Sequence, residues 1–199
     1  MLPCQTILDF WFGQHEDQMK IIETQSSLWW GKDQKIDAEI KSRFGFYLEK
    51  GIDSILDKWR KDARGRLALI ILIDQFSRNI FRNQAEAYAR DNIALDLCLE
   101  GLDYGHDRQL RSVERVFFYM PLEHSEVLAY QNKSVALFRS LEDVVDLKLK
   151  EKFTGFTDFA EKHRVIIERF GRFPHRNDIL QRTSTEEELE FLEKPGSSF

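Results

Sequence analysis

The sequence predicts an all-α protein, because helical periodicity dominates it and strand signals are scarce. Over residues 33–50 an apolar side chain recurs at every fourth position, and Gly51 follows as a stop signal. The recurring apolar residues are Ile36, Ile40, Phe44 and Leu48. No Asn-Gly or Asp-Gly hairpin turn occurs in the sequence, and no long segment alternates apolar and polar residues with a period of two.

Capping residues indicate where the longer helices begin and end. Asp91 is expected to cap a helix that closes near Gly105, and Pro121 is expected in the first turn of a helix that runs to about residue 141. Gly171 is predicted to end a long helix. The inward stripe of that helix consists of Phe156, Phe159, Ala160, His163, Ile166, Ile167 and Phe170.

Two further segments are also predicted to be helical. Ser184 and Thr185 are each followed three residues later by Glu, so either residue can begin a last short helix with a capping box. Residues 69–73 are apolar enough for a buried strand. We interpret them as part of a helix over 67–82, because that segment contains neither Gly nor Pro.

The composition indicates a single globular domain over residues 1–199. The sequence is 42% hydrophobic, which is enough for a buried core without disulfides or metals. The net charge of −5 argues against a nucleic-acid partner and an anionic membrane surface, and no run approaches the ~18 apolar residues of a membrane span. Only Cys4 and Cys98 are present, without metal-ligand spacing. We therefore expect a cytoplasmic protein.

The first of three polar clusters lies on the helix predicted over 67–82. This helix is apolar on nearly every side, which is typical of a buried helix, yet a polar stripe runs along it at helical spacing. The stripe consists of Asp74, Gln75, Arg78, Asn79 and Arg82. Asp74 and Arg78 are four residues apart and can pair. The stripe is an internal salt-bridge network, the wall of a polar pocket, or an exposed edge.

The second cluster is the segment 121–126, Pro-Leu-Glu-His-Ser-Glu, at a predicted helix start. Glu123 and Glu126 suit the positive end of a helix dipole, which is a structural role. His124 lies beside both carboxylates and is a candidate proton donor or acceptor, because its unperturbed pKa is about 6.5. No metal site is expected, because no second His lies one turn away.

The third cluster spans residues 163–177 around a predicted helix end. His163 lies on the apolar stripe, either as a hydrogen-bonded core residue or as a candidate catalytic group. Arginine forks suit carboxylate and phosphate groups, so this helix end is a candidate anion site. Its candidate ligand-binding residues are Arg169, Arg172, His175, Arg176 and Asn177. The alternative is that the arginines cap backbone carbonyls and pair with Asp74, Glu123 or Glu126.

The charges of the three clusters do not balance. The arginines are Arg78, Arg82, Arg169, Arg172 and Arg176, and the acidic residues are Asp74, Glu123 and Glu126. Convergence of the clusters would leave a surplus of positive charge. A negatively charged ligand would then complete the site.

Four segments of the chain are distinctive in their residue order. They are LDFWFG at 8–13, DQFSRNIFR at 74–82, EHSE at 123–126 and RFGRFPHRN at 169–177. With the closing PGSSF at 195–199, they resemble the bacterial family known as domain of unknown function 924. Ser77 stands where that family usually has Pro, and Gln181 where it usually has Gly. The resemblance implies a tetratricopeptide-like stack of antiparallel helices with degenerate repeats, and it implies no activity.

The leading functional prediction is binding of a small anionic ligand by the three clusters. In a catalytic version, His124 or His163 moves protons and is oriented by Glu126 or Asp74, while arginines hold the anion. No phosphate loop, dinucleotide fingerprint, nucleophile elbow or metal motif is present, so the sequence names no reaction and predicts no cofactor. The alternative is a protein-interaction scaffold whose polar network is purely structural. Enzymatic activity and oligomeric state stay open.

Overall fold

The computed structural model describes residues 3–51 and 57–197, and no residue in these ranges lies in a strand. The elements are α1 (Cys4–Phe12), α2 (Gln18–Trp30), α3 (Gln34–Phe46), π-helical η1 (Tyr47–Gly51), α5 (Ala63–Ile70), π-helical η2 (Ile71–Gln75), α6 (Phe76–Ile80), η3 (Ala85–Ala87), α7 (Asp91–Asp103), η4 (Asp107–Gln109), α8 (Ser112–Glu123), α9 (Leu128–Val144), α10 (Leu147–Phe170), η5 (Pro174–Arg176) and α11 (Glu186–Leu192). The predicted all-α class is confirmed. The tetratricopeptide-like order of the stack stays a prediction.

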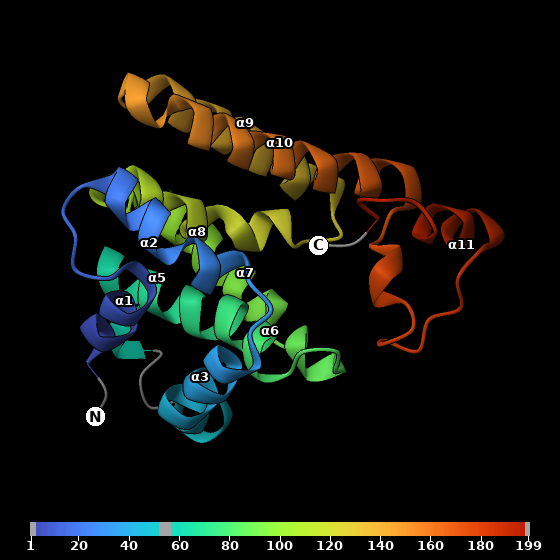
Figure 1. Cartoon of the computed structure of the whole chain (residues 1–199), viewed down its shortest axis with the longest axis horizontal. Coiled ribbons are helices and arrows are strands. Elements are labelled where there is room, and N and C mark those ends of the chain that lie inside the picture. Colours follow the sequence, from blue (N-terminus) through green and yellow to red (C-terminus); the bar gives the residue numbers. More distant parts are fainter. Residues whose placement is uncertain (1–2, 52–56, 198–199) are drawn as a thin grey trace.

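The helices are arranged in layers (Figure 1). Helices α9 and α10 lie side by side as an outer layer, and α8 and α2 lie beneath them. The run α5–η2–α6 and helix α7 form the next layer, with α1 and α3 beyond it. The segment after α10 folds back beside these layers and carries α11. The candidate site is built where α6, α7, α8 and this last segment meet.

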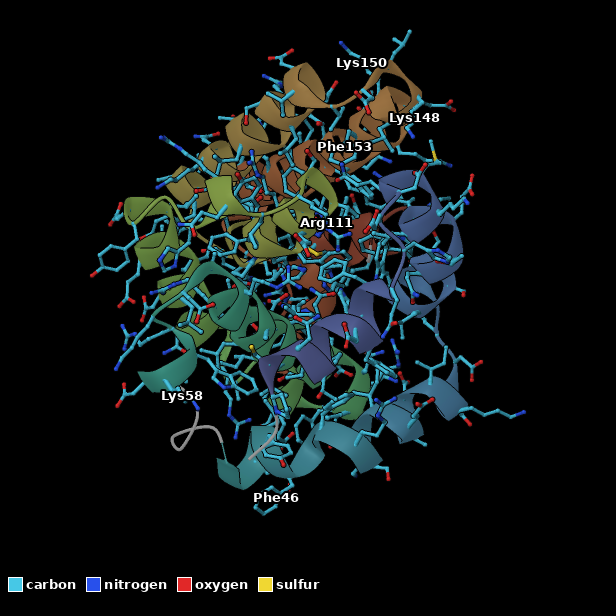
Figure 2. The ribbon with its side chains drawn as sticks, turned by 90° about the vertical axis from the view of Figure 1, so that its left-hand side faces the viewer. Phe46, Lys58, Arg111, Lys148, Lys150 and Phe153 are labelled. Carbon is cyan, nitrogen blue, oxygen red and sulfur yellow. The ribbon has the colours of Figure 1, made fainter. Side chains whose placement is uncertain are left out.

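Amphipathic helices enclose an aromatic core. Figure 2 shows Phe153 of α10 pointing inward, whereas Lys148 and Lys150 of the same helix point outward. In the centre, the ring of Trp11 meets those of Phe76 and Phe117 edge to face, with centroids 5.5 and 5.4 Å apart. A separate small apolar cluster lies beneath the last segment. It contains Ile166, Ile167 and Phe173, flanked by Phe170 and Phe191.

Several predicted helix ends are confirmed. The Asp33 side chain accepts a hydrogen bond from the backbone N–H of Lys35 and caps α3. Gly171 ends α10 in the left-handed conformation with φ 67°. Thr185 and Glu188 form the capping box that begins α11, so Thr185 rather than Ser184 is the cap.

Two predicted helix starts are wrong. Pro121 lies in the last turn of α8, which ends at Glu123, and the next helix begins at Leu128. Helix α8 begins at Ser112, where Arg111 and Glu114 form a capping box. This box has no Ser or Thr, so the usual capping-box sequence motif does not predict it. Asp91 is the first residue of α7 and not its cap, because its carboxylate is engaged by Arg78. The acidic residues of segment 121–126 therefore lie at a helix end.

The central helix is continuous but contains a π-helical turn, η2, between α5 and α6. The extra residue in such a turn rotates the faces of the helix, and π-turns are frequent at functional sites. The predicted polar stripe is consequently divided. Asn79 and Arg82 bind Asp37 of α3 at N···O distances of 2.8 Å, whereas Asp74 and Arg78 face α7 and α8.

The backbone at Gln181 is strained, with φ 53°. We expect Gln181→Gly to raise the free energy of unfolding by about 0.5–1 kcal/mol, because the left-handed region costs a side-chain-bearing residue roughly 1–2 kcal/mol and the entropy of glycine offsets part of the gain. Asn83→Gly, at φ 62°, is the matched control, since Asn tolerates this region better. Urea denaturation measures both variants, and an unchanged or lowered value for Gln181→Gly would contradict the prediction.

Candidate functional site

Asp74 and His124 form a buried pair at the centre of the site. The Nδ1 atom of His124 lies 2.8 Å from Oδ1 of Asp74, and the side-chain amide of Gln75 donates to Oδ2 at 2.6 Å. Arg78 lies 3.2 Å from Oδ1 of the same carboxylate. Burial opposes ionisation of Asp74, but Arg78 and His124 outweigh it and hold its pKa below the usual range. Asp74 is therefore an anion held by three donors, His124, Gln75 and Arg78.

The His124 ring is neutral in this setting, because burial and the positive charge of Arg78 lower its pKa despite the Asp74 carboxylate. A neutral ring that donates from Nδ1 to Asp74 keeps the lone pair of Nε2. This is the arrangement in which an acidic residue orients a histidine as a proton acceptor. The predicted proximity of Asp74 to His124 is thus found in the structure.

Asp91 joins the central pair to the last segment of the chain. Both terminal nitrogens of Arg78 bind its carboxylate, at 3.1 and 3.0 Å. Arg176 approaches the same carboxylate less closely, with Nη1 3.6 Å from Oδ2, and donates from Nη1 to the backbone carbonyl of His124 at 3.1 Å. The two guanidinium groups therefore share Asp91 unequally, and Arg78 holds most of it.

Arg176 is buried, with 7% of its side chain exposed, and it is incompletely paired. Its guanidinium carbon lies over two aromatic rings, 4.3 Å from the centroid of Phe173 and 4.7 Å from that of Tyr88. Its Nε atom is buried and finds no acceptor in the described part of the chain. Burial, followed by repulsion from Arg78, lowers the pKa of Arg176 to about 10. The site thus contains a buried N–H donor without a hydrogen-bond acceptor in the described part of the chain.

Glu123 and His163 form a second buried pair beside the first. The Nδ1 atom of His163 lies 2.8 Å from the carbonyl oxygen of Phe159 and 3.2 Å from Oε1 of Glu123. Burial and the neighbouring Asp74 raise the pKa of Glu123 to about 8, and burial lowers the pKa of His163 to about 3. The His163 and His124 rings are 6.3 Å apart. At neutral pH the uncharged Glu123 and His163 therefore lie beside the Asp74 anion and the neutral His124 ring.

Glu126 does not join His124, although both lie on the same predicted segment. Its carboxylate accepts from the backbone N–H of Phe173 at 2.9 Å and binds Arg182 at 2.7 and 3.0 Å. Arg182 also donates to Asn177 at 2.9 Å. Glu126 thus anchors the last segment to the connection between α8 and α9, and its predicted catalytic role stays a prediction.

The third predicted cluster is divided by the turn after α10. Arg172 binds both carboxylate oxygens of Glu188 at 2.6 and 2.7 Å, and Arg169 reaches Glu187 at 2.7 Å. Asn177 also donates to Glu188, at 3.3 Å. These contacts tie α11 to the end of α10. Of this cluster, Arg176 and His163 reach the central pair, and His175 lies next to them with its ring 5.6 Å from that of Phe173.

The surplus of positive charge expected from the sequence does not arise. Each of the arginines in that count has a carboxylate partner or neighbour, because the count omitted acids from other segments. The omitted acids are Asp37, Asp91, Glu187 and Glu188. The sequence reasoning also missed Tyr88 and Arg182. The sequence offered a signal for Asp91, since an acidic residue at a predicted helix start can form an ion pair as well as cap the helix.

A hollow of about 480 Å³ lies on the last segment, lined by Pro174, His175, Asp178, Arg182, Ser184, Leu189 and Leu192. None of Asp74, His124 and Arg176 lines it. The acidic and basic residues that line the hollow are Asp178 and Arg182, and Arg182 already binds Glu126. The hollow is therefore distinct from the buried cluster of Asp74, His124 and Arg176.

Comparison with known proteins places the chain in a family. A model of the family described as "Bacterial protein of unknown function (DUF924)" matches residues 7–196. The chain belongs to this family. It is similar to a solved structure described as the protein of unknown function ATU0120 from Agrobacterium tumefaciens, with 37% identity, a TM-score of 0.78 and coverage of 96% of each chain. No curated protein matches the sequence. The family resemblance of the four segments is thereby confirmed.

All members of the buried cluster lie within the stretch that the DUF924 model matches. In residues 3–51 and 57–197, no three His, Cys, Asp or Glu side chains are grouped so as to hold a metal ion. Over the same residues, no helix combines the length and the apolar character that crossing a membrane requires.

Proposed function

We propose that this DUF924 protein binds a small anionic ligand at Arg176, beside the Asp74–His124 pair. The observation that carries the proposal is the buried Nε–H of Arg176, which has no acceptor in the described chain. An unpaired buried donor costs about 1–3 kcal/mol, and more when it is charged. A carboxylate or phosphate oxygen supplies both the missing acceptor and a negative charge. Contacts of the guanidinium with the rings of Tyr88 and Phe173 restrict its position, which favours binding of such a group.

Proton transfer forms the second part of the proposal. A ligand bound to Arg176 lies next to His124, because Arg176 donates to the carbonyl of that same residue. His124, oriented by Asp74, is the proton acceptor, and Glu123, which keeps its proton to about pH 8, is the donor beside it. Environments that lower the pKa of one carboxyl group, here Asp74, and raise that of another, here Glu123, are typical of acid–base sites. Two free cysteines suit placement in the cytosol.

A thermal-shift screen against phosphate, phosphorylated metabolites and carboxylates tests the proposal. At about 100 times its dissociation constant, a ligand adds about 2.7 kcal/mol to the free energy of unfolding, a shift that is easily measured. Arg176→Met keeps the apolar stem beside the two rings and removes the guanidinium. We expect it to abolish the shift by any hit and to leave the ligand-free stability unchanged or raised, because it removes an under-compensated buried charge.

Arg172→Ala is the matched control, because Arg172 lies on the same segment but binds Glu188. It should keep the ligand response. The proposal fails if no anion shifts the unfolding temperature, or if Arg176→Met lowers stability sharply and retains the response. Either outcome favours the alternative, a protein-interaction scaffold in which the polar cluster is structural, and a search for protein partners would follow.

A further inference from the structure

We infer that the ligand carries a single negative charge, as a monocarboxylate does, and that Asp91 disfavours doubly charged ions; this rests on the proposed anion site and specifies its occupant. Carboxylate and phosphate oxygens both suit the Nε–H donor of Arg176, so the donor alone does not separate them. The charges that surround Arg176 do.

The charged side chains next to Arg176 balance before any ligand binds. Arg78 lies 3.2 Å from Oδ1 of Asp74 and binds Asp91 through both terminal nitrogens, at 3.1 and 3.0 Å. Arg176 approaches the same Asp91 carboxylate at 3.6 Å. Both guanidinium carbons face the ring of Tyr88, at 5.6 Å for Arg78 and 4.7 Å for Arg176, so the two cations are neighbours. Two guanidinium groups are thus matched by two carboxylates.

The other titratable groups around this cluster add no net charge at pH 7. Burial keeps four of them uncharged, because it raises the pKa of the carboxyl group and lowers the pKa of each imidazole. These four are Glu123, His124, His163 and His175. Glu126 and Arg182 neutralise each other, with N···O distances of 2.7 and 3.0 Å. Every negative charge that a ligand brings is therefore added to a balanced cluster.

One such charge is accommodated locally, because the positive charge of Arg176 is the less compensated of the two. Asp91 is held mainly by Arg78, which also donates from Nη1 to the backbone carbonyl of Asp74 at 2.7 Å. Burial, followed by repulsion from Arg78, lowers the pKa of Arg176 to about 10, so its surroundings oppose its charge. A singly charged oxygen at Nε relieves this. A second negative charge finds no unpaired cation among the described residues of the cluster.

Asp91 supplies the repulsion that separates singly from doubly charged ions. Its carboxylate is the one that approaches Arg176, and its side chain is 22% exposed whereas that of Asp74 is fully buried. The charge of Asp91 therefore lies where the cluster meets solvent. Like charges repel much more strongly in a partly buried site than in water, and the repulsion doubles for an ion with two charges. A repulsive group of this kind discriminates between ligands because it costs the rejected one more.

Methanesulfonate and sulfate separate the effect of charge from that of shape, since both are tetrahedral and they carry one and two negative charges. Each is titrated into the full-length ¹⁵N-labelled protein at pH 7 and constant ionic strength, and acetate is titrated in the same way. The Arg176 Nε–H resonance reports binding by NMR. We expect acetate and methanesulfonate each to bind at least about tenfold more tightly than sulfate, because Asp91 repels the second charge.

A substitution at Asp91 tests whether this residue sets the preference. Asp91→Asn removes the charge and keeps the shape, so affinity for sulfate should rise more than affinity for acetate, and the preference should shrink about tenfold. Asp37→Asn is the matched control, because Asp37 also binds an arginine, Arg82 at 2.8 Å, and is similarly exposed at 17%, but lies on α3 outside the cluster. It should leave the preference unchanged. Thermal unfolding establishes that each variant is folded, and the anion series on the parent protein decides if Asp91→Asn is not.

A monocarboxylate has two sources, a free acid or the C-terminus of a polypeptide. N-acetylated triglycine with a free carboxylate distinguishes them. If it binds as tightly as acetate, chain ends are ligands, and if acetate alone binds, the ligand is a free acid; both results support a singly charged ligand. Binding of the corresponding triglycine amide as tightly as the free-carboxylate form would overturn it.

The outcomes also separate this inference from the proposed function. If none of the three anions moves the Arg176 resonance, the anion site is wrong and the inference fails with it. If sulfate binds as tightly as methanesulfonate and Arg176→Met abolishes the binding of both, the anion site stands and the preference for a single charge is overturned. A preference that persists unchanged in Asp91→Asn overturns the role of Asp91.

Discussion

Replacing Arg66 with alanine is expected to lower the free energy of unfolding by roughly 3–5 kcal/mol. Arg66 is 1% exposed and donates to the backbone carbonyls of Leu97 and Arg60 at 2.9 and 2.6 Å. It also binds Glu100 at 3.1 Å and Nδ1 of His106 at 3.1 Å. Without it, buried carbonyls lose their donor and a cavity opens between α5 and α7. Equilibrium urea denaturation followed by circular dichroism measures the decrease in the free energy of unfolding.

Arg64 of the same helix is the matched control for Arg66. Its side chain is 45% exposed and lies 3.3 Å from the buried carboxylate of Glu114, which Arg111 also binds at 3.0 Å. Arg64→Ala should change stability little, because the Arg64 side chain is solvent-exposed and Glu114 keeps its hydrogen bonds with Arg111. A loss below about 1 kcal/mol for Arg66→Ala, or equal losses for both variants, would show that Arg66 does not hold these helices together.

Glu123→Gln is expected to remove a large pH dependence of stability. Burial and Asp74 raise the pKa of Glu123 from its ordinary value of 4.5 to about 8 in the folded protein. Between these values the unfolded chain releases a proton that the folded chain keeps, so stability is full below about pH 4.5 and falls as pH rises, by up to about 1.4 kcal/mol per unit. The uncharged glutamine cannot ionise. The variant should match the parent near pH 5 and exceed it by roughly 2–4 kcal/mol at pH 8.

Glu126→Gln is the control, because the pKa of Glu126 is shifted in the opposite direction to that of Glu123 and the effect on stability is opposite in sign. Hydrogen bonds from Arg182 and the Phe173 backbone outweigh burial and hold the pKa of Glu126 below its usual range. Its contribution to stability is therefore present at neutral pH and lost as pH falls, and the variant should be less stable than the parent at pH 7. Urea denaturation from pH 5 to pH 8 measures all three proteins. Parallel profiles for the parent and Glu123→Gln would mean that Glu123 is ionised in the fold.

The helices were predictable where a local signal decides the backbone. Gly171 in the left-handed conformation and the Thr185 capping box act within a few residues, so the sequence alone reveals them. Pro121 misled the prediction, because proline marks a first turn only when other signals agree, and here it lies in the last turn of α8. The π-turn at 71–75 has no simple sequence pattern, so the division of the polar stripe could not be foreseen.

The site was predictable in its residue types and not in its pairings. Asp74, His124 and Arg176 lie at three separate places in the sequence. Asp74 was a candidate as part of a polar stripe on an apolar helix, His124 because two carboxylates are its sequence neighbours, and Arg176 as an arginine near a predicted helix end. Their partners depend on tertiary packing. Asp91, read as a helix cap, binds Arg78 and approaches Arg176, so the expected surplus of positive charge is replaced by one incompletely paired guanidinium.

The most direct test of the anion site follows the Nε–H resonance of Arg176 by NMR while inorganic phosphate, and separately acetate, is added to ¹⁵N-labelled protein. An acceptor oxygen at this donor should move the resonance downfield in a saturable way, and the Nε–H of Arg172, already bound to Glu188, should stay unchanged. That result is the one we predict. An Arg176 resonance that stays in place at saturating ligand would contradict the account, since the buried donor would then serve the fold and not a ligand.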